Sequence, residues 1–336
     1  EFSSGTSNAV IVVNAARDHE KSVEWAITQG YPVLVEKPLC LNFVAAQRLA
    51  KLALTRKIYA ATAHVFLFSS YVQSFSKLLV NKNEIISISV LWMDPQTESR
   101  YGEAKYYDPG LPVYADWLPH IVSILGVFAL GPAQLCTNIG FLKGGAQLKI
   151  NLMFGKIPCV IDLVRNGNSR QRIFEVTTKQ KKVTLDFGIE PGTIYNDVTT
   201  FCGDPNWNNK PRPVAKMLTA FLQGAAGGIC DARLDISIGL NACQMIDQTA
   251  SLYHTAMLLW LVTELAKHQD GVSSDLRYSL NEILQMKAPN SPVPIGQRID
   301  YVYRHIKDYT FTSYGEAECC AAEVIDLIIK NGETSS

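Results

Sequence analysis

The feature that most constrains the fold is a strand–helix–strand pattern that covers residues 9–38 and ends on the tripeptide Glu36-Lys37-Pro38. Residues 9–13 and 31–35 are short, continuous apolar runs, which are typical of parallel strands buried on both faces. Proline donates no ladder hydrogen bond, so the second strand must end here. Lys37 then stands at the carboxyl end of a buried strand, where open α/β sheets hold their ligands. On its own, the tripeptide is more often a strand end with a solvated charge pair.

The segments around this corner predict a partial doubly wound sheet. Asp18 and Asn42 are placed to cap the two helices, and Gly30 to end the first of them. Residues 58–63 form a third short strand, which completes a βαβαβ half of such a sheet. Residues 64–80 follow as an aromatic-rich helix, whose rings we expect in the core.

The middle of the chain has the pattern of an antiparallel sheet. Residues 84–93 alternate as the entry strand, and the long stretch 94–114, rich in Tyr, Pro and Gly, predicts a binding loop. Turn residues separate further predicted strands, at 134–140, 147–154, 158–164 and 172–177, with a fifth at 182–187. Two helices, 214–223 and 234–253, are predicted to return and pack on the first domain.

The last part of the chain reads as helices joined by polar links. The predicted ranges are 254–267, 275–286, 296–306 and 314–330. We therefore expect an α/β domain followed by an α+β domain and a helical extension, at residues 1–82, 83–255 and 256–336. The sequence assigns no chemistry to the extension.

A second group of polar residues, Asp116 and His120, lies on a predicted helix. Side chains four positions apart share one helix face, where a carboxylate can orient an imidazole and raise its basicity. The alternative is a helix cap followed by a surface histidine. His64 follows the third strand and points toward the same crevice, either as a structural histidine or as a substrate contact. Tyr106 and Tyr107 either offer rings and hydroxyls to a polyol or only cover the surface.

The stretches 10–19 and 33–38, with Gly30 between them, resemble the later half of the nucleotide-binding domain in the glucose–fructose oxidoreductase/inositol dehydrogenase (Gfo/Idh/MocA) family. That family has a strand ending in Thr-Pro, a His four positions after the Pro, a helix closed by Gly and a strand ending in Glu-Lys-Pro. The resemblance covers roughly residues 8–255.

The match to this pattern is close but incomplete. The spacing from His19 to Glu36 has no gap, whereas Asn14 and Ala15 stand where Thr and Pro are usual. On the second helix, the family has a Gly between the Asp and the His, and this chain instead has Pro119 just before the His. A different local backbone is therefore expected there.

The resemblance implies an NAD- or NADP-dependent oxidoreductase that transfers a hydride to or from a sugar or cyclic polyol. It also implies a Lys37–Pro38 peptide bond that is cis or strongly turned. The implied catalytic residues are Lys37, Asp116 and His120. The residues implied on the cofactor side are Asn14, His19, Glu36, Lys37 and Pro38, and those on the substrate side are His64, Tyr106 and Tyr107.

The phosphate-binding glycine loop of such enzymes is missing from the sequence. No G-x-G-x-x-G occurs among the 22 glycines, and the pair Gly144-Gly145 is expected to form a turn. In the family, the βαβ unit with this loop precedes the stretch that begins here. We therefore expect a family member that lacks this unit and binds NAD or NADP weakly or not at all.

The composition excludes several other classes of protein. The chain has 336 residues, enough for two cores, and no net charge, so neither nucleic acid nor an anionic surface is an expected partner. The longest apolar stretch, 256–262, is too short to span a bilayer. The eight cysteines contain no C-x-x-C pair, which favours free thiols in the cytoplasm over disulfides, zinc or another metal.

Three functions remain open from the sequence. The first is the sugar or polyol dehydrogenase, expected to form a dimer or other homo-oligomer through its antiparallel sheet. The second is a non-catalytic relative, a sugar-binding or scaffold protein that has lost cofactor binding. The third is a fragment that works only when a separate chain supplies the missing strands. Survival of the Lys, Asp and His together favours the first, because a scaffold needs none of them.

Overall fold

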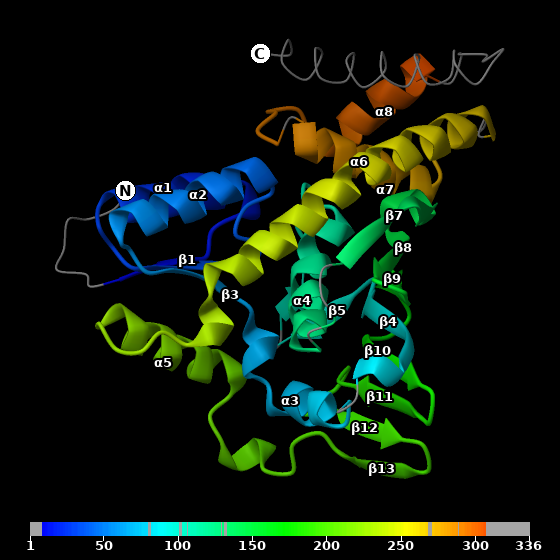
Figure 1. Cartoon of the computed structure of the whole chain (residues 1–336). Helices are drawn as coiled ribbons and strands as arrows, with labels where there is room; N and C mark the ends of the chain where they lie inside the picture. Colours follow the sequence, from blue (N-terminus) through cyan, green and yellow to red (C-terminus); the bar gives the residue numbers. More distant parts are fainter. Residues whose placement is uncertain are drawn as a thin grey trace.

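A computed structural model shows a small parallel sheet and a large mixed sheet, with helices packed on both and a long helix running between them (Figure 1). The structure describes residues 9–79, 82–100, 103–105, 107–128, 130, 133–267, 271–287 and 289–306. The expected fold class is confirmed: a partial Rossmann-like sheet, a second sheet domain and a helical extension.

The small sheet contains strands β1 (Val10–Val12), β2 (Val33–Glu36) and β3 (Ala60–Ala63), all parallel and in sequence order. Helices α1 (His19–Thr28) and α2 (Phe43–Arg56) connect them and lie together on one face of the sheet (Figure 1). The strands are short apolar runs because both faces of β2 and β3 are buried.

Local signals placed these boundaries with one exception. Asn42 caps α2, since its Oδ1 accepts a hydrogen bond from the Ala45 amide at 2.9 Å. Gly30 follows α1 with φ +84°, a conformation that favours glycine. The prediction that Asp18 caps α1 was wrong. Its backbone is already helical, and its carboxylate accepts no hydrogen bond from the amides of the first turn. Extended backbone at the cap position is what lets a side chain reach back.

The aromatic helix predicted over residues 64–80 is shorter than expected. A 3₁₀ turn, η2 (Val65–Phe68), comes first, and helix α3 (Ser70–Lys77) begins after it. His64 therefore lies before a tight turn and not inside a helix. The rings of Phe68, Tyr71 and Phe75 are buried as predicted.

The large sheet has eight strands within the described residues, in the order β13-β12-β11-β10-β4-β9-β8-β7. Its strands are β4 (Ile85–Pro95), β7 (Ala133–Leu142), β8 (Gln147–Phe154), β9 (Ile157–Gly167), β10 (Gln171–Thr178), β11 (Lys182–Asp186), β12 (Thr193–Asn196) and β13 (Thr199–Cys202). Every pairing is antiparallel except β4 with β9, so the purely antiparallel expectation was wrong at this one pair. β4 enters from the first domain and inserts between two later strands, which periodicity alone does not reveal.

Two other parts of this domain differ from the prediction. The stretch 94–114 is not one long loop, because β5 (Glu98–Arg100) and β6 (Glu103–Lys105) pair as a hairpin inside it. Strands β12 and β13 were not predicted, because each has only four residues and little alternation between polar and apolar residues.

Two helices join the domains. Helix α4 (Val113–Val127) packs its apolar face on the large sheet, in a core that includes Trp92, Ile150 and Leu118. Helix α6 (Ile236–Lys267) is continuous over 32 residues, so the two separate helices predicted on either side of position 253 form one. Its Cys243 is buried in the core of the first domain, and its Tyr253 in the core of the second.

The remaining helices lie at the two ends of α6 (Figure 1). Helix α5 (Pro213–Ala225) precedes it, and helices α7 (Ser274–Lys287) and α8 (Ile295–Ile306) follow as predicted. The predicted helix over 314–330 lies outside the described residues. Among the described residues, no helix combines the length and apolar character needed to cross a membrane.

Candidate active site

The tripeptide corner stands at the carboxyl end of β2. The Lys37–Pro38 peptide bond is cis, which confirms that expectation. The Lys37 amine turns away from the first domain toward α4, where it donates two hydrogen bonds to one residue. They go to the Asp116 carbonyl oxygen at 2.8 Å and to the Asp116 Oδ1 at 2.5 Å. Residues 79 positions apart, on different domains, thus meet in one ion pair.

His19 holds the other side of this corner together. Its ring is buried, with Nδ1 2.7 Å from the Pro38 carbonyl oxygen and Nε2 3.0 Å from the Asn14 carbonyl oxygen. Both ring nitrogens thus face backbone carbonyls, and neither is left for a ligand. His19 therefore ties the end of β1 to the proline that follows β2.

The other residues expected on the cofactor side lie at the ends of β1 and β2. The Asn14 amide donates to the Ser22 hydroxyl at 2.9 Å. A Glu36 carboxylate oxygen accepts a hydrogen bond from the Lys37 backbone amide at 3.3 Å. Both side chains lie at the edge from which Lys37 reaches α4.

Helix α4 presents Asp116 and His120 one turn apart, as their spacing predicted. The helix continues across Pro119, although this residue has no amide hydrogen to offer the Ala115 carbonyl. The neighbouring Asp116 carbonyl receives the Lys37 amine as a hydrogen-bond donor. The lysine thus bonds both the backbone and the side chain of the helix at this point.

The imidazole of His120 sits among aromatic rings. It stacks on Trp92 with ring centres 5.6 Å apart and planes at 10°, and it meets the edge or face of Phe66 at 4.9 Å. Its Nδ1 has no hydrogen-bond partner among the described residues. Buried polar atoms are normally satisfied, so the unpartnered ring nitrogen beside an ion pair makes His120 a candidate for proton transfer.

Arg165 completes the charge arrangement around Asp116. Its guanidinium lies 3.4 Å from Asp116 Oδ2, on the side opposite Lys37, and its side chain is only 3% exposed. The same guanidinium lies over the Tyr107 ring, 4.6 Å from its centre. One carboxylate is therefore held between two cations.

These neighbours set the protonation states of the site. Burial raises the pKa of the Asp116 carboxyl, but Lys37 and Arg165 together lower it further, and the net pKa lies well below its usual range. Burial, with Lys37 adding to it, lowers the pKa of His120 well below its usual range. The same two causes lower the pKa of His64 to about 4. At neutral pH, Asp116 is ionised and both imidazoles are neutral.

The three residues expected on the substrate side differ in their position relative to the site. His64 is 1% exposed and close enough to His120 for their charges to interact, so it lies behind the site and not in an open crevice. Tyr107 is 40% exposed beside Arg165 and remains available to a substrate. Tyr106 lies outside the described residues.

Sequence reasoning missed Arg165 and Trp92. Arg165 was the easier one to find, because Cys159, Ile161 and Leu163 alternate as inward-facing residues of β9 and Arg165 continues that alternation. An arginine at a buried strand position needs a carboxylate partner, and that requirement is a usable signal. Nothing local to Trp92 marks it as the platform for His120.

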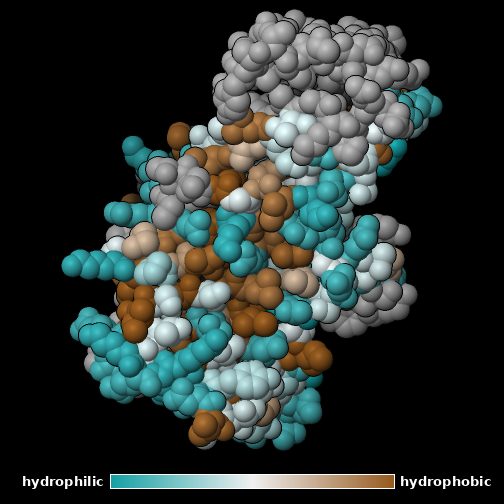
Figure 2. Space-filling model, turned by 90° about the vertical axis from the view of Figure 1, so that its right-hand side faces the viewer, coloured by the Kyte–Doolittle hydropathy of each residue, from teal (hydrophilic) through white to brown (hydrophobic). Residues whose placement is uncertain are grey.

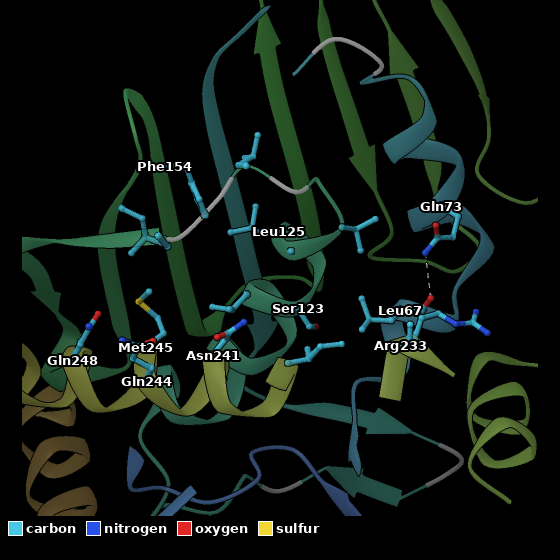
Figure 3. A pocket seen from close by; sticks show the side chains of 18 residues that line it. Leu67, Gln73, Ser123, Leu125, Phe154, Arg233, Asn241, Gln244, Met245 and Gln248 are labelled. Carbon is cyan, nitrogen blue, oxygen red and sulfur yellow. Dashed lines mark hydrogen bonds between the residues drawn. The ribbon is translucent and has the colours of Figure 1, made fainter. Parts of the chain in front are cut away.

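A cavity of about 840 Å³ lies on another side of α4 (Figure 3). Leu125 and Ser123 on α4, Met245 and Asn241 on α6, and Phe154 on β8 are among the side chains around it. Neither Lys37, Asp116 nor His120 lines this cavity. The chemistry of the ion pair therefore lies elsewhere, and we place the candidate active site at Lys37 and not at this cavity.

Replacing the shared carboxylate tests the ion pairs. Asp116→Asn should lower the free energy of unfolding at pH 7 by about 1.5–3 kcal/mol, the value of charge-assisted hydrogen bonds. Because the folded pKa of Asp116 lies below the unfolded value of about 3.9, its contribution is complete at neutral pH and declines as the pH falls below about 4. Urea unfolding of both proteins from pH 7 to pH 3 measures this.

The matched control is Glu20→Gln, which removes a carboxylate on α1 that is 40% exposed and 2.9 Å from Arg48 Nη2. It should change stability little at any pH, as exposed pairs do. If the free energies of unfolding of wild type and Asp116→Asn differ by the same amount at every pH down to 3, the proposed ionisation is contradicted.

Comparisons with known proteins bear on this arrangement. Residues 2–64 match a family model described as the GFO_IDH_MocA oxidoreductase family with an NAD-binding Rossmann fold. The matched segment contains β1, β2 and the Lys37 corner. The comparison with curated proteins gave no match.

Solved structures share the fold over most of the chain. A UDP-N-acetylglucosamine 3-dehydrogenase, GnnA, from Acidithiobacillus ferrooxidans matches with TM-score 0.62 and 16% identity, over 74% of this chain and 80% of its own. The 3-ketoreductase KijD10 from Actinomadura kijaniata, in complex with NADP, matches with TM-score 0.58 and 16% identity, over 72% and 76%. A dehydrogenase, MviM, from Clostridium difficile matches with TM-score 0.59 and 12% identity, over 73% and 78%. The resemblance of this chain to the Gfo/Idh/MocA oxidoreductase family is therefore confirmed, by the family model over residues 2–64 and by the shared fold over most of the chain.

Proposed function

We propose that the protein is an NAD(P)-dependent oxidoreductase that acts on a hydroxyl or ketone of a sugar. The observation that carries this proposal is the ion pair between Lys37 and Asp116 beside the neutral imidazole of His120. A scaffold gains little from a lysine and a carboxylate placed half-buried at a domain junction. An enzyme that moves a proton to or from a hydroxyl needs such groups.

Each residue of the site has a role in this reaction. The His120 imidazole takes the proton from the substrate hydroxyl oxygen during oxidation and returns it during reduction. The Lys37 ammonium donates a hydrogen bond to the same oxygen and stabilises its developing negative charge. Asp116 holds the lysine in place. The nicotinamide ring, when bound, supplies the hydride acceptor or donor.

The described residues fit only one end of such a cofactor. Asn14 and Glu36 lie at the carboxyl ends of β1 and β2, next to Lys37, where polar groups can meet a nicotinamide and its ribose. For the pyrophosphate, the sequence contains no G-x-G-x-x-G motif whose backbone amides could approach a phosphate closely.

The names of two similar structures support a sugar as the substrate class. GnnA is named as a UDP-N-acetylglucosamine 3-dehydrogenase, and KijD10 as a 3-ketoreductase. We place a sugar, free or linked to a nucleotide, with its reacting carbon between His120 and Lys37. Tyr107 lies beside this site with an exposed ring, which suits the apolar face of a sugar ring.

A sugar-binding protein without catalysis is the second candidate. The lack of a G-x-G-x-x-G motif in the sequence favours it, because a protein that only binds a sugar needs no phosphate loop. The two functions differ in one measurement: a binding protein takes up the sugar without NAD(H) or NADP(H) and gives no turnover when they are added.

We also propose that the protein is a homodimer that pairs through the outer face of the large sheet. α4 covers the inner face, whereas the side chains that alternate outward, such as Leu91, Val160 and Ile173, are only partly buried. Figure 2 shows hydrophobic side chains gathered over the middle of this side of the molecule. A second copy of the same face would bury them.

Calorimetry tests the cofactor site. Titrating NADH and NADPH into the 336-residue chain should give dissociation constants weaker than about 10⁻⁵ M, because the glycine cradle for the pyrophosphate is missing from the sequence. Low-micromolar binding would show that other backbone amides serve the phosphates.

Kinetics at saturating cofactor test the catalytic roles on a panel of 3-hydroxy and 3-keto sugars and sugar nucleotides. His120→Ala should lower kcat by roughly 10²–10⁴-fold with little change in KM, since the proton moves in the transition state. Lys37→Ala should lower kcat and raise KM, because the lysine also positions the substrate. Lys156→Ala, at the exposed turn after β8, is the control and should change neither. An active His120→Ala enzyme would exclude the histidine as the proton acceptor.

Sedimentation velocity tests the dimer. Val160→Glu should convert the protein to a monomer, because it buries a carboxylate in the centre of the proposed interface. Leu54→Glu, an equally drastic change at an 80% exposed position on α2, should leave the dimer intact. A monomeric wild-type protein at micromolar concentration would refute this part of the proposal.

A further inference from the structure

The helical extension reaches the active site through Arg165. This guanidinium contacts Asp116 Oδ2 at 3.4 Å, and its Nη1 donates to the Leu111 carbonyl at 3.0 Å and to the Tyr278 hydroxyl at 3.3 Å. Tyr278 belongs to α7, more than 100 residues further along the chain. A buried arginine held by two domains fixes the position of whatever it binds.

Tyr278 also lies within reach of a buried carboxylate. Glu282 lies one turn further along α7 and is 2% exposed. It accepts a hydrogen bond from Tyr253 on α6, and its charge acts on Tyr278 and Arg165. The Tyr278 hydroxyl oxygen accepts a hydrogen bond from Arg165. The chain of interactions thus runs from Glu282 to Tyr278, Arg165 and Asp116, and ends at Lys37.

The glycine pair Gly144-Gly145 lets α7 pack closely at this place. The 3₁₀ turn η4 (Lys143–Gly145) packs against α7, and Lys143 pairs with Asp275 at 3.8 Å. A Cβ on Gly144 would overlap the carbonyl oxygen of Asp275, and one on Gly145 would overlap the hydroxyl of Tyr253. Both glycines have positive φ. The turn therefore allows α7 and Tyr253 to approach as closely as the contacts require.

We infer that α7 is part of the active-site machinery, in which Tyr278 and Glu282 act through Arg165 as positioning residues for Asp116 and Lys37. The inference rests on the proposed function for its catalytic consequence, although the positioning itself does not need it. It gives the extension a role that its sequence did not indicate.

The charge on Glu282 makes the positioning sensitive to pH. Burial raises the pKa of Glu282 to about 7, against the opposing effects of Tyr253, Arg165 and Tyr278. Tyr114 on α4 and Tyr107 also face this carboxylate, which acts on the pKa of both. Below pH 7, Glu282 is protonated and Asp116 is the only charged carboxylate of this pair that attracts Arg165. Above pH 7, the ionised Glu282 attracts the same guanidinium.

The first experiment needs neither cofactor nor sugar. It measures the rate at which acetic anhydride modifies Lys37, by mass spectrometry, with the other lysines as internal references. Tyr278→Phe should raise this rate at least about twofold, the lower limit of coupling within one hydrogen-bond network, because Asp116 is held less firmly. Arg277→Gln, next to Tyr278 but 51% exposed, is the control and should leave the rate unchanged.

The second experiment uses turnover. Tyr278→Phe should lower kcat about 2–30-fold with little change in KM, the range for residues that act through a network. Glu282→Gln should remove a transition near pH 7 from the kcat profile of the wild type. An unchanged Lys37 modification rate in Tyr278→Phe would overturn the inference. Absence of any wild-type turnover would refute the proposed function alone, since the modification rates would still decide the positioning.

Discussion

The rest of the site depends on the ion pair between Lys37 and Asp116. The lysine belongs to the first domain and the aspartate to the second, so this ion pair joins the two domains directly. Taking both groups out of water is costly, and their attraction offsets the cost only when further hydrogen bonds satisfy the remaining donors and acceptors. Here the Asp116 carbonyl oxygen accepts a second hydrogen bond from Lys37, and Arg165 pairs with the second carboxylate oxygen of Asp116. The geometry of the junction is therefore set by charge, and the packing of α4 and α6 supports it.

Features that depend on a few neighbouring residues were readable from the sequence. Pro38 had to end a strand, Asn42 could cap a helix, and Gly30 could close one, because each effect acts within one turn of the chain. The placement of Asp116 and His120 on one face of α4 follows from helical spacing in the same way. Asp18 failed as a cap for a reason that is also local, its helical backbone, but the conformation of a single residue is not visible in the sequence.

Features that depend on distant residues could not be read. The insertion of β4 between β9 and β10 is a matter of topology, and an alternating strand fits either direction of pairing. The continuity of α6 past position 253 follows from having one core on each side of it, a fact that neither half of the helix carries. Arg165 and Glu282 each looked like an isolated charge, and only the fold shows that Tyr278 lies between them.

The two titrating groups on α4 show how one helix turn serves two purposes. Asp116 and His120 share a face, yet cations surround the first and aromatic rings the second. Cations favour the charged carboxylate, whereas burial and the nearby Lys37 charge disfavour the charged imidazole, so one group is ionised and the other neutral at the same pH. A neutral imidazole can take a proton, and an ionised carboxylate can hold a lysine beside it. Trp92 and Phe66 pack on His120 and contribute to the burial that lowers its pKa and keeps it neutral.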